Sequence, residues 1–476
     1  MSQDKIGADQ WVSSYDKRKS APTGIYADIE RIRNKIPLWG WFALLFAASA
    51  ILPLVTSNAF VIRIGANIAL MAVLGTGLNL VVGYAGLLDL GFIAFYGIGA
   101  YIYAYLSSEF TGLHLDTGIT LVVITVITAL FGLLLGLPSL RLVGDYLAIV
   151  TLGFGQMFVN LATSLTRVNL PGQEDPVNLT GGPNGIPNLD SLNFFGFKTS
   201  TVTDYYYVLL AVLAVVLVVV YHLNRSRLGR AWRALREDEL AAEVMGMPTR
   251  RLKLQAFAIG AAIAGLSGGL FASFQGAVFP ANFDIALLIT LYAIIVLGGL
   301  GSLPGVLLGA VIMMAVPDIL RNAQLAGVLF YVGAIITLFA TLKPRRLTLP
   351  LLALLGVFGL AITFVVASTT PDISATLVPV GSPVGVWLPI PADATLVGNI
   401  AFFAALFMAL FVSRIKDRTW RFIALIPTLY LLAFVWETRL SQEPSVTRLL
   451  FVGILLVVLM IYRPNGLLGQ KRVEVV

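Results

Sequence analysis

Apolar stretches long enough to cross a bilayer recur along this chain from Leu38 to Tyr462. The hydrocarbon core of a bilayer is about 30 Å thick, so a spanning helix needs about 20 mostly apolar residues. Because 58% of the residues are hydrophobic and only 12% are charged, the polar surface is too small to cover a soluble globule of this size. The sequence therefore predicts an all-α polytopic membrane protein.

Fourteen apolar segments are expected to form its helices. They lie near residues 38–56, 60–82, 86–107, 118–138, 145–165, 205–223, 254–275, 284–301, 303–320, 325–342, 347–369, 396–412, 419–435 and 446–462. Glycines and a proline between Gly298 and Gly305 interrupt the 284–320 pair, so a re-entrant half-helix is an alternative to two full crossings there.

The positions of Lys and Arg predict the orientation. If the N-terminus is cytoplasmic and every segment crosses, most of the 32 basic residues fall on the cytoplasmic side, where short loops normally carry them. The first 36 residues are polar, without the apolar run of a signal peptide. We therefore expect a multi-pass protein of a bacterial inner membrane, with both termini in the cytoplasm.

The cytoplasmic loop 224–253 carries an amphipathic pattern. Residues 226–247 predict a helix on which Arg233 and Glu237 lie one turn apart on one face. Its apolar stripe comes from Leu228, Ala231, Trp232 and Leu235. Two interpretations are open. Its arginines favour a helix lying on anionic lipid, whereas the acids Glu237, Asp238, Glu239 and Glu243 favour docking to a protein partner.

Six motifs occur in order along most of the chain. They are GLNLVVGYAGLLDLGFIAFYGIGAY at 77–101, RLVGDYLAIVTLGFGQM at 141–157, LTGGPNGI at 179–186, the loop 228–246, VLGGLGSLPGVLLGA at 296–310 and YRPNGLLG at 462–469. In these motifs the chain resembles the permease family of branched-chain amino acid ABC importers, which also includes urea and short-chain amide permeases.

The resemblance implies a translocation path for branched-chain or other neutral amino acids. It also implies a second homologous permease, two cytoplasmic ATPase subunits that hold ATP and Mg, and a periplasmic or lipid-anchored substrate-binding protein. No cofactor is expected on this chain. Membrane lipid is an expected partner, and nucleic acid is not. The loop then resembles the coupling helix that docks on the ATPase, with matching positions at Arg233, Glu237, Asp238, Ala241 and Gly246.

The chain is longer than the family pattern, which runs almost directly from the 303–320 segment to the last helix. This difference predicts a cytoplasmic tail at 1–36, a core at 37–322, an insert at 323–445, and a final helix with a cytoplasmic tail at 446–476. The core then has about ten helices and the insert about four. Because four is an even number, the insert leaves the orientation of the last helix unchanged.

Ionisable and polar groups inside the apolar segments are candidates for the substrate path, because they are costly in lipid. Asp89 is the main ionisable candidate, and its alternative role is to cap the start of its helix. Hydrogen bonds to a zwitterionic substrate are also available from Asn79, Tyr84, Tyr96, Tyr101 and Gln156.

Two other classes of protein, a membrane enzyme and a secondary transporter or channel, are alternatives. The chain has no Cys, and its two histidines, His114 and His222, fall near opposite faces, so no catalytic or metal-binding cluster is expected. A secondary transporter or channel for a small polar solute is the second interpretation, but ion coupling predicts paired acids deep in the helices. The sequence also lacks G-x-x-x-x-G-K-[ST], so ATP hydrolysis is expected on partner chains.

Overall fold

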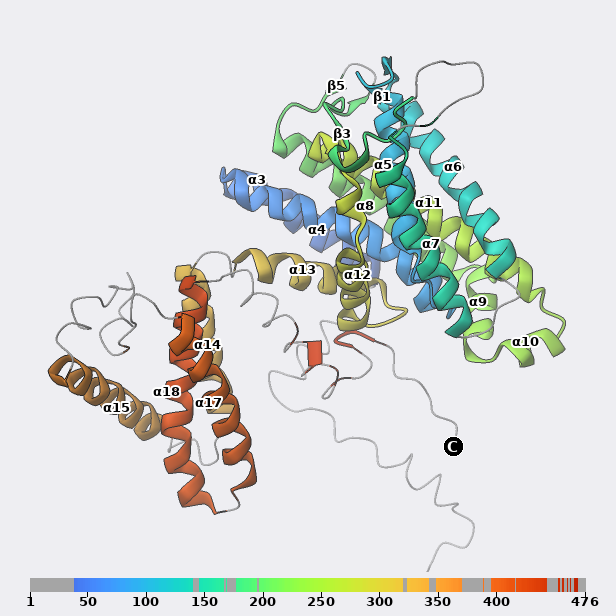
Figure 1. The fold of residues 1–476 in the computed structure, drawn as a ribbon. Helices are drawn as coiled ribbons and strands as arrows, with labels where there is room; N and C mark the ends of the chain where they lie inside the picture. Colours follow the sequence, from blue (N-terminus) through green and yellow to red (C-terminus); the bar gives the residue numbers. More distant parts are fainter. Residues whose placement is uncertain are drawn as a thin grey trace, which may run out of the picture.

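A computed structural model describes residues 38–139, 145–166, 168, 177–194, 197–319, 323–341, 348–369, 388, 395–415 and 417–442, with a few positions between 453 and 469. Its helices, labelled in Figure 1, are α3 (Leu38–Val55), α4 (Ala59–Leu78), α5 (Phe92–Leu106), α6 (Thr117–Ser139), α7 (Asp145–Ser164), α8 (Val202–Arg225), α9 (Arg227–Glu237), α10 (Glu239–Val244), α11 (Thr249–Gln275), α12 (Ile285–Gly298), α13 (Leu303–Ile319), α14 (Ala323–Thr341), α15 (Thr348–Thr369), α17 (Thr395–Arg414) and α18 (Arg418–Gln442).

The predicted fold class is confirmed. Every predicted segment up to 419–435 coincides with a described helix, and the last segment, 446–462, lies largely outside the described residues. Eight of the described helical stretches are long and apolar enough to cross a membrane. The chain is therefore an all-α polytopic membrane protein.

Helix α11 lies at the centre of the core, packed against α4, α5 and α6. Its glycines allow the α5 backbone to approach closely: a Cβ added at Gly268 would overlap the carbonyl oxygen of Tyr96, and one added at Gly99 would overlap that of Gly265. The hydrophobic effect does not drive helices together in lipid, so van der Waals contact between closely packed backbones is a main contribution to helix association. These glycines therefore determine how α5 and α11 pack.

The helix predicted at 86–107 begins later than expected. Helix α4 continues into a π-helical turn, η1 (Asn79–Tyr84), and the chain then runs without helix until Phe92. Gly86 has a φ of 74°, a left-handed conformation that ends the helical path, and Gly91 is the N-cap of α5. The segment 85–91 is therefore a non-helical break between the π-helical turn and α5.

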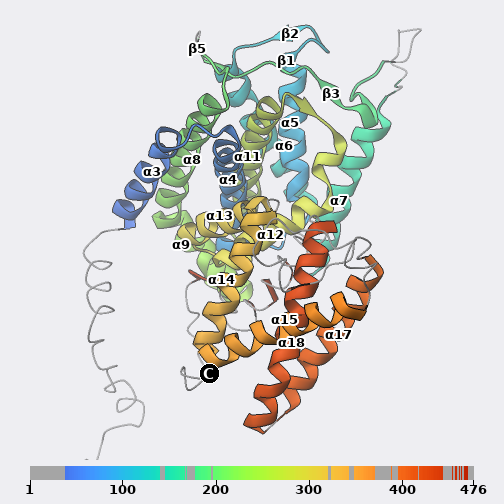
Figure 2. The same ribbon diagram turned by 90° about the vertical axis from the view of Figure 1, so that its left-hand side faces the viewer.

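The two ends of the core differ. One end carries three short antiparallel strand pairs: β1 (Ser107–Ser108) with β2 (Leu113–His114), β3 (Ile186–Pro187) with β6 (Ala277–Val278), and β4 (Asn193–Phe194) with β5 (Phe197–Lys198). Helices α9 and α10 lie at the opposite end, at the lower right of the core in Figure 1, and Figure 2 shows α9 below α8. We call these the strand end and the α9–α10 end.

A capping box explains why α8 starts at the strand end. The hydroxyl of Thr201 accepts a hydrogen bond from the N–H of Asp204 at 3.2 Å, and the Asp204 carboxylate accepts one from the N–H of Thr201 at 2.9 Å. Two N–H groups that a helix start leaves without helical partners are thereby satisfied. From this fixed start, α8 runs to Arg225 at the α9–α10 end.

Four helices, α14, α15, α17 and α18, are described within residues 323–445. Helix α18 packs on the other three, and the group has its own apolar cluster centred on Tyr430 and Phe434. Trp436 stacks on Phe330 with ring centroids 4.4 Å apart, and the buried Glu437 accepts a hydrogen bond of 3.0 Å from Tyr331. These four helices thus have internal packing of their own.

Candidate functional site

The helix predicted over 226–247 is two helices rather than one, which corrects that expectation. Asp238 is extended, with φ of −156° and ψ of 112°, and it separates α9 from α10. Its carboxylate accepts a hydrogen bond of 3.0 Å from the N–H of Ala241, as an N-cap of α10. A good capping residue inside a continuous helical pattern is thus the physical reason for the break.

The apolar stripe of α9 faces the protein core. Trp232 is fully buried, and its indole Nε1 donates a hydrogen bond of 2.9 Å to the carbonyl of Leu252 at the start of α11. Leu235 is buried beside it. An interfacial helix would need this stripe to enter lipid. Since the core already covers the stripe, the contacts count against the lipid interpretation.

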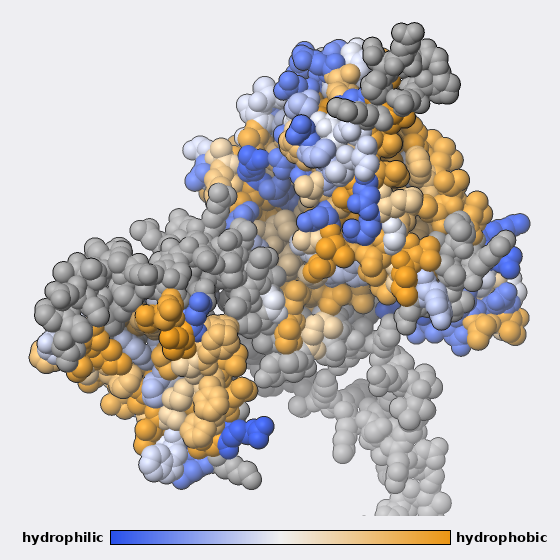
Figure 3. Space-filling model, viewed as in Figure 1, coloured by the Kyte–Doolittle hydropathy of each residue, from blue (hydrophilic) through white to orange (hydrophobic). Residues whose placement is uncertain are grey.

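Helix α10 presents an exposed surface of mixed character. Leu240, Val244 and Met245 are 74%, 86% and 79% exposed, and acidic side chains lie among them. Figure 3 shows apolar next to hydrophilic side chains at its lower right, where Figure 1 places α10. The buried Lys253 holds α10 to α11 through an ion pair of 2.5 Å with Glu239. We call Leu240, Val244 and Met245, with the exposed acids Glu237, Asp238 and Glu243, the α10 surface.

The five predicted coupling residues are all exposed, and they lie on α9, at the break between α9 and α10, on α10 or in the turn after it. Arg233 donates a hydrogen bond of 3.3 Å to the carbonyl of Asn224, which holds its guanidinium beside the end of α8. Gly246 has a φ of 80° and ends the α10 segment, a conformation that glycine adopts without strain. Ala241 lies on α10 itself, one turn before Met245.

Arg236 is a residue that the sequence interpretation missed. It projects from α9 into the core, where its guanidinium Nη1 donates a hydrogen bond to the carbonyl of Gly83 in the π turn. Its aliphatic stem packs against Gly86, and its guanidinium lies against Gly301. The available signal was its spacing: Arg236 follows Trp232 by four residues, so it lies on the buried face of the helix.

Three backbone breaks meet around Arg236. The side-chain oxygen of Asn79 accepts a hydrogen bond of 2.8 Å from the N–H of Gly301, in the turn between α12 and α13. The N–H groups of Leu467 and Leu468 donate to the carbonyls of Leu297 and Gly298, each at 2.9 Å. We call the π turn 79–84, the break 85–91, the turn 299–302 and residues 466–469 the glycine junction.

The glycine junction joins four of the six motifs. Residues 77–101, 228–246, 296–310 and 462–469 are far apart in sequence but in contact here. Gly299 and Gly301 have φ values of 118° and 78°, which side-chain-bearing residues rarely adopt. Helices α12 and α13 pack side by side as a hairpin closed by this turn. The 3₁₀ helix η3 (Pro280–Phe283) and α12 together are long enough to cross a membrane. The re-entrant half-helix therefore stays a prediction beside the full crossing.

Three of the six predicted path residues, Asn79, Tyr84 and Asp89, lie at the glycine junction. Asn79 and Tyr84 are both buried in the π turn, and the Tyr84 hydroxyl has no hydrogen-bond partner within the described part of the chain. Asp89 is 1% exposed, and one carboxylate oxygen accepts a hydrogen bond of 2.9 Å from Gly91. Because Gly91 is the N-cap of α5, Asp89 orients the capping residue and is not itself the cap.

The other predicted path residues lie elsewhere. Tyr96 and Tyr101 belong to an aromatic cluster around Phe283, with ring centroids 5.6 and 6.2 Å from it. Gln156 is exposed on α7. The six side chains therefore do not form one site, and Gln156 does not line the interior of this chain.

Comparison with known proteins identifies relatives over the core. The family model for the permease component of branched-chain amino acid transport systems matches residues 60–342. The Escherichia coli high-affinity branched-chain amino acid permease protein LivM is 41% identical over 298 residues, which cover 58% of this chain and 67% of that protein. LivH of the same organism is 28% identical over 278 residues, covering 56% and 85%. A probable LivM from Methanocaldococcus jannaschii is 27% identical over 292 residues, covering 59% and 79%. No solved structure matches the chain.

Proposed function

The chain belongs to the family of permease components of branched-chain amino acid transport systems, and we propose that it works as the membrane subunit of an ATP-driven importer. Its substrates are branched-chain or other neutral amino acids. ATP and Mg bind to two separate cytoplasmic ATPase subunits, and this chain supplies the path. A periplasmic or lipid-anchored binding protein delivers the substrate.

The α10 surface is the observation that carries this proposal. Leu240, Val244 and Met245 are large apolar side chains at the end of a membrane helix bundle, yet acids surround them. Acids disfavour an anionic lipid surface, whereas an apolar centre with a charged rim is typical of a protein interface. This surface is where the ATPase subunit docks.

A second permease completes the membrane unit. The chain is similar both to LivM and to LivH, which are named as permease proteins of the same kind of system. These two similarities support a pair of homologous permeases. The α9–α10 end then faces the cytoplasm of a bacterial inner membrane, and both termini lie on that side, as the distribution of Lys and Arg predicts.

Movement of the ATPases is transmitted through α9. The ion pair of Lys253 with Glu239 and the buried Trp232 hold α9 and α10 to the start of α11, so the unit moves as a body. Arg236 joins that body to the π turn and to the α12–α13 turn. Glycine turns absorb changes in backbone angle, so the glycine junction is the hinge between two states of the bundle.

A docking experiment tests this function. The double variant Leu240→Glu/Val244→Glu places two charges in the centre of the α10 surface, and we expect the ATPase subunits to be lost from the complex after mild extraction. The exposed Arg230 donates to the carbonyl of Arg225, away from this surface, so Arg230→Ala is the matched control. The charge reversals Arg233→Glu and Glu237→Arg are expected to abolish uptake without reducing insertion. Full ATPase retention in the double variant would refute the docking proposal.

A further inference from the structure

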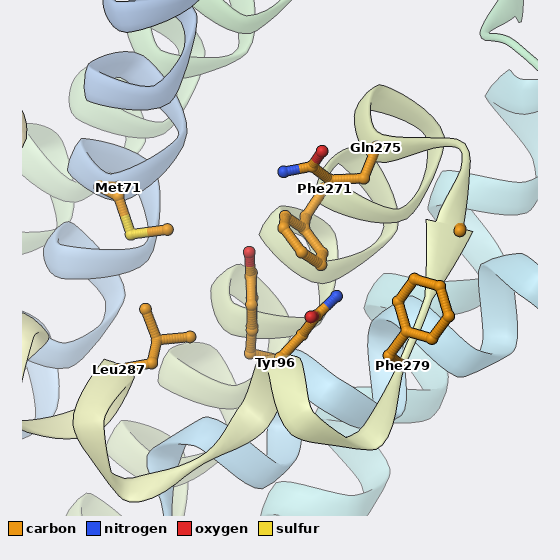
Figure 4. Close-up of a pocket in the computed structure, with 8 residues that line it drawn as sticks. Met71, Tyr96, Phe271, Gln275, Phe279 and Leu287 are labelled. Atoms are coloured by element: carbon orange, nitrogen blue, oxygen red, sulfur yellow. The ribbon is translucent and has the colours of Figure 1, made fainter. Parts of the chain in front are cut away.

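A cavity of about 370 Å³ lies toward the strand end of the core, within the size range of small-ligand sites, about 300–1,000 Å³. It is bounded by α4, α5, α11 and the segment that leads into α12. Its lining residues are Met71, Tyr96, Phe271, Gln275, Ala277, Phe279, Asn282 and Leu287 (Figure 4). It is therefore distinct from the glycine junction.

Tyr96 places a buried polar group in this cavity. Its side chain is fully buried, and its hydroxyl has no hydrogen-bond partner among the residues that the structure describes. Burying a hydroxyl without a partner is costly, so such a group is normally satisfied by water or by a ligand. Figure 4 shows the hydroxyl pointing into the space between Met71 and Phe271. The ring itself is held in place by Phe271 and Phe283, with centroids 5.3 and 5.6 Å away.

A cation and an amide stand at the rim. Arg63 donates a hydrogen bond of 3.2 Å to the side-chain oxygen of Gln275, and its guanidinium lies 5.8 Å from the centroid of the Phe274 ring. Because the Gln275 oxygen is used by Arg63, the amide NH₂ remains as a donor. Asn282 adds a second amide to the lining. A carboxylate is the group that such a set of donors and positive charge favours.

The remaining wall is apolar. Met71 and Leu287 lie on one side of the Tyr96 hydroxyl, and Gln275 lies on the other (Figure 4). Phe271 and Phe279 add aromatic rings to the lining. None of the lining side chains is acidic or basic, so a ligand with a second, side-chain charge would be left unpaired there.

From these contacts we propose that the cavity binds a small α-amino acid with an uncharged, apolar side chain. The carboxylate is held at Gln275 beside Arg63, the Tyr96 hydroxyl bonds to the polar head, and the side chain rests on Met71 and Leu287. This inference rests on the proposed function and deepens it, because it assigns a substrate site within the membrane subunit itself. The strand end that borders the cavity, through the β3–β6 pair, is the side from which the ligand enters.

Photo-labelling of the reconstituted complex tests the site. The probe is a diazirine analogue of leucine, and labelled peptides are identified by mass spectrometry. We expect labels on the peptides that carry Met71, Phe271 and Leu287, removed by excess leucine but not by lysine or glutamate. Tyr96→Phe deletes only the hydroxyl, and loss of one hydrogen bond should reduce labelling about two- to tenfold. Gln275→Leu, which changes an exposed rim residue, should do the same.

Matched controls separate this site from the function itself. Tyr103 lies on the same helix, and its hydroxyl donates a hydrogen bond to the carbonyl of Asp190 outside the cavity. Tyr103→Phe should therefore leave labelling unchanged. Labels that leucine does not displace, or that ignore both Tyr96→Phe and Gln275→Leu, would overturn the site and indicate a lipid chain or water there. ATP-driven leucine uptake by the unaltered complex is measured in parallel, so failure of the site and failure of the proposed function are distinguishable.

Discussion

Replacing Arg236 by alanine should uncouple ATP hydrolysis from transport. The variant loses the guanidinium that donates to the carbonyl of Gly83 and the stem that packs on Gly86. A hydrogen bond to a charged group contributes about 1.5–3 kcal/mol, and a loss of about 2 kcal/mol corresponds to about thirtyfold in an equilibrium. Because this hydrogen bond joins α9 to the glycine junction, we expect its free energy to be lost from the coupling between movement of α9 and movement of the glycine junction.

The assay measures two rates on the same proteoliposomes. ATP hydrolysis should persist, because the α10 surface is unchanged, whereas amino acid uptake per ATP should fall about 10- to 100-fold. Arg236→Lys keeps the positive charge on a single donor nitrogen, so it should recover part of the uptake. A residue that only stabilises the fold would alter the yield of protein and not the uptake per ATP. Arg230→Ala, an exposed change on the same helix, should leave both rates unaltered. An unchanged uptake per ATP in a fully assembled Arg236→Ala complex would refute the reasoning.

Two further predictions concern stability. Trp232→Ala should destabilise the protein by about 3–5 kcal/mol, because it leaves a cavity under α9. Trp232→Phe should cost about 1 kcal/mol for the lost hydrogen bond to Leu252. Thermal unfolding in detergent measures both variants, and equal unfolding midpoints would contradict the described packing of Trp232. Gly99→Ala should lower the yield of folded protein sharply, because its Cβ would overlap the backbone of α11, while Gly153→Ala has open space and should be neutral. Similar yields for the two glycine variants would show that α5 and α11 do not pack as described.

The helices were predictable because each one needs about 20 apolar residues, and such runs are visible in a single sequence. The break between α9 and α10 was missed, although Asp238 is a good N-cap, because the helical periodicity continues on both sides of it. Arg236 was missed because its partner, Gly83, is 153 residues away. Contacts of that kind depend on which helices become neighbours, and hydropathy does not carry this information.

The candidate path residues show the same limit. A polar residue in an apolar segment is recognisable, but the side of the helix that faces the interior depends on packing. Tyr96 is a polar residue of this kind, and the structure points its hydroxyl into a cavity. Gln156 was chosen by the same reasoning, yet it is exposed on α7. The lining amides Gln275 and Asn282 lie at the end of α11 and in the short 3₁₀ helix η3, where polar residues are common and do not by themselves indicate a site.

ATP-dependent uptake by the reconstituted complex tests the central claim most directly. The chain is extracted gently with its native partners, the co-purifying chains are identified by mass spectrometry, and the complex is placed in vesicles with its binding protein. We predict ATPase chains and a second permease in the preparation, and leucine accumulation that requires ATP and stops when hydrolysis is blocked. A lone chain or homo-oligomer that moves amino acids equally well without ATP would contradict the account.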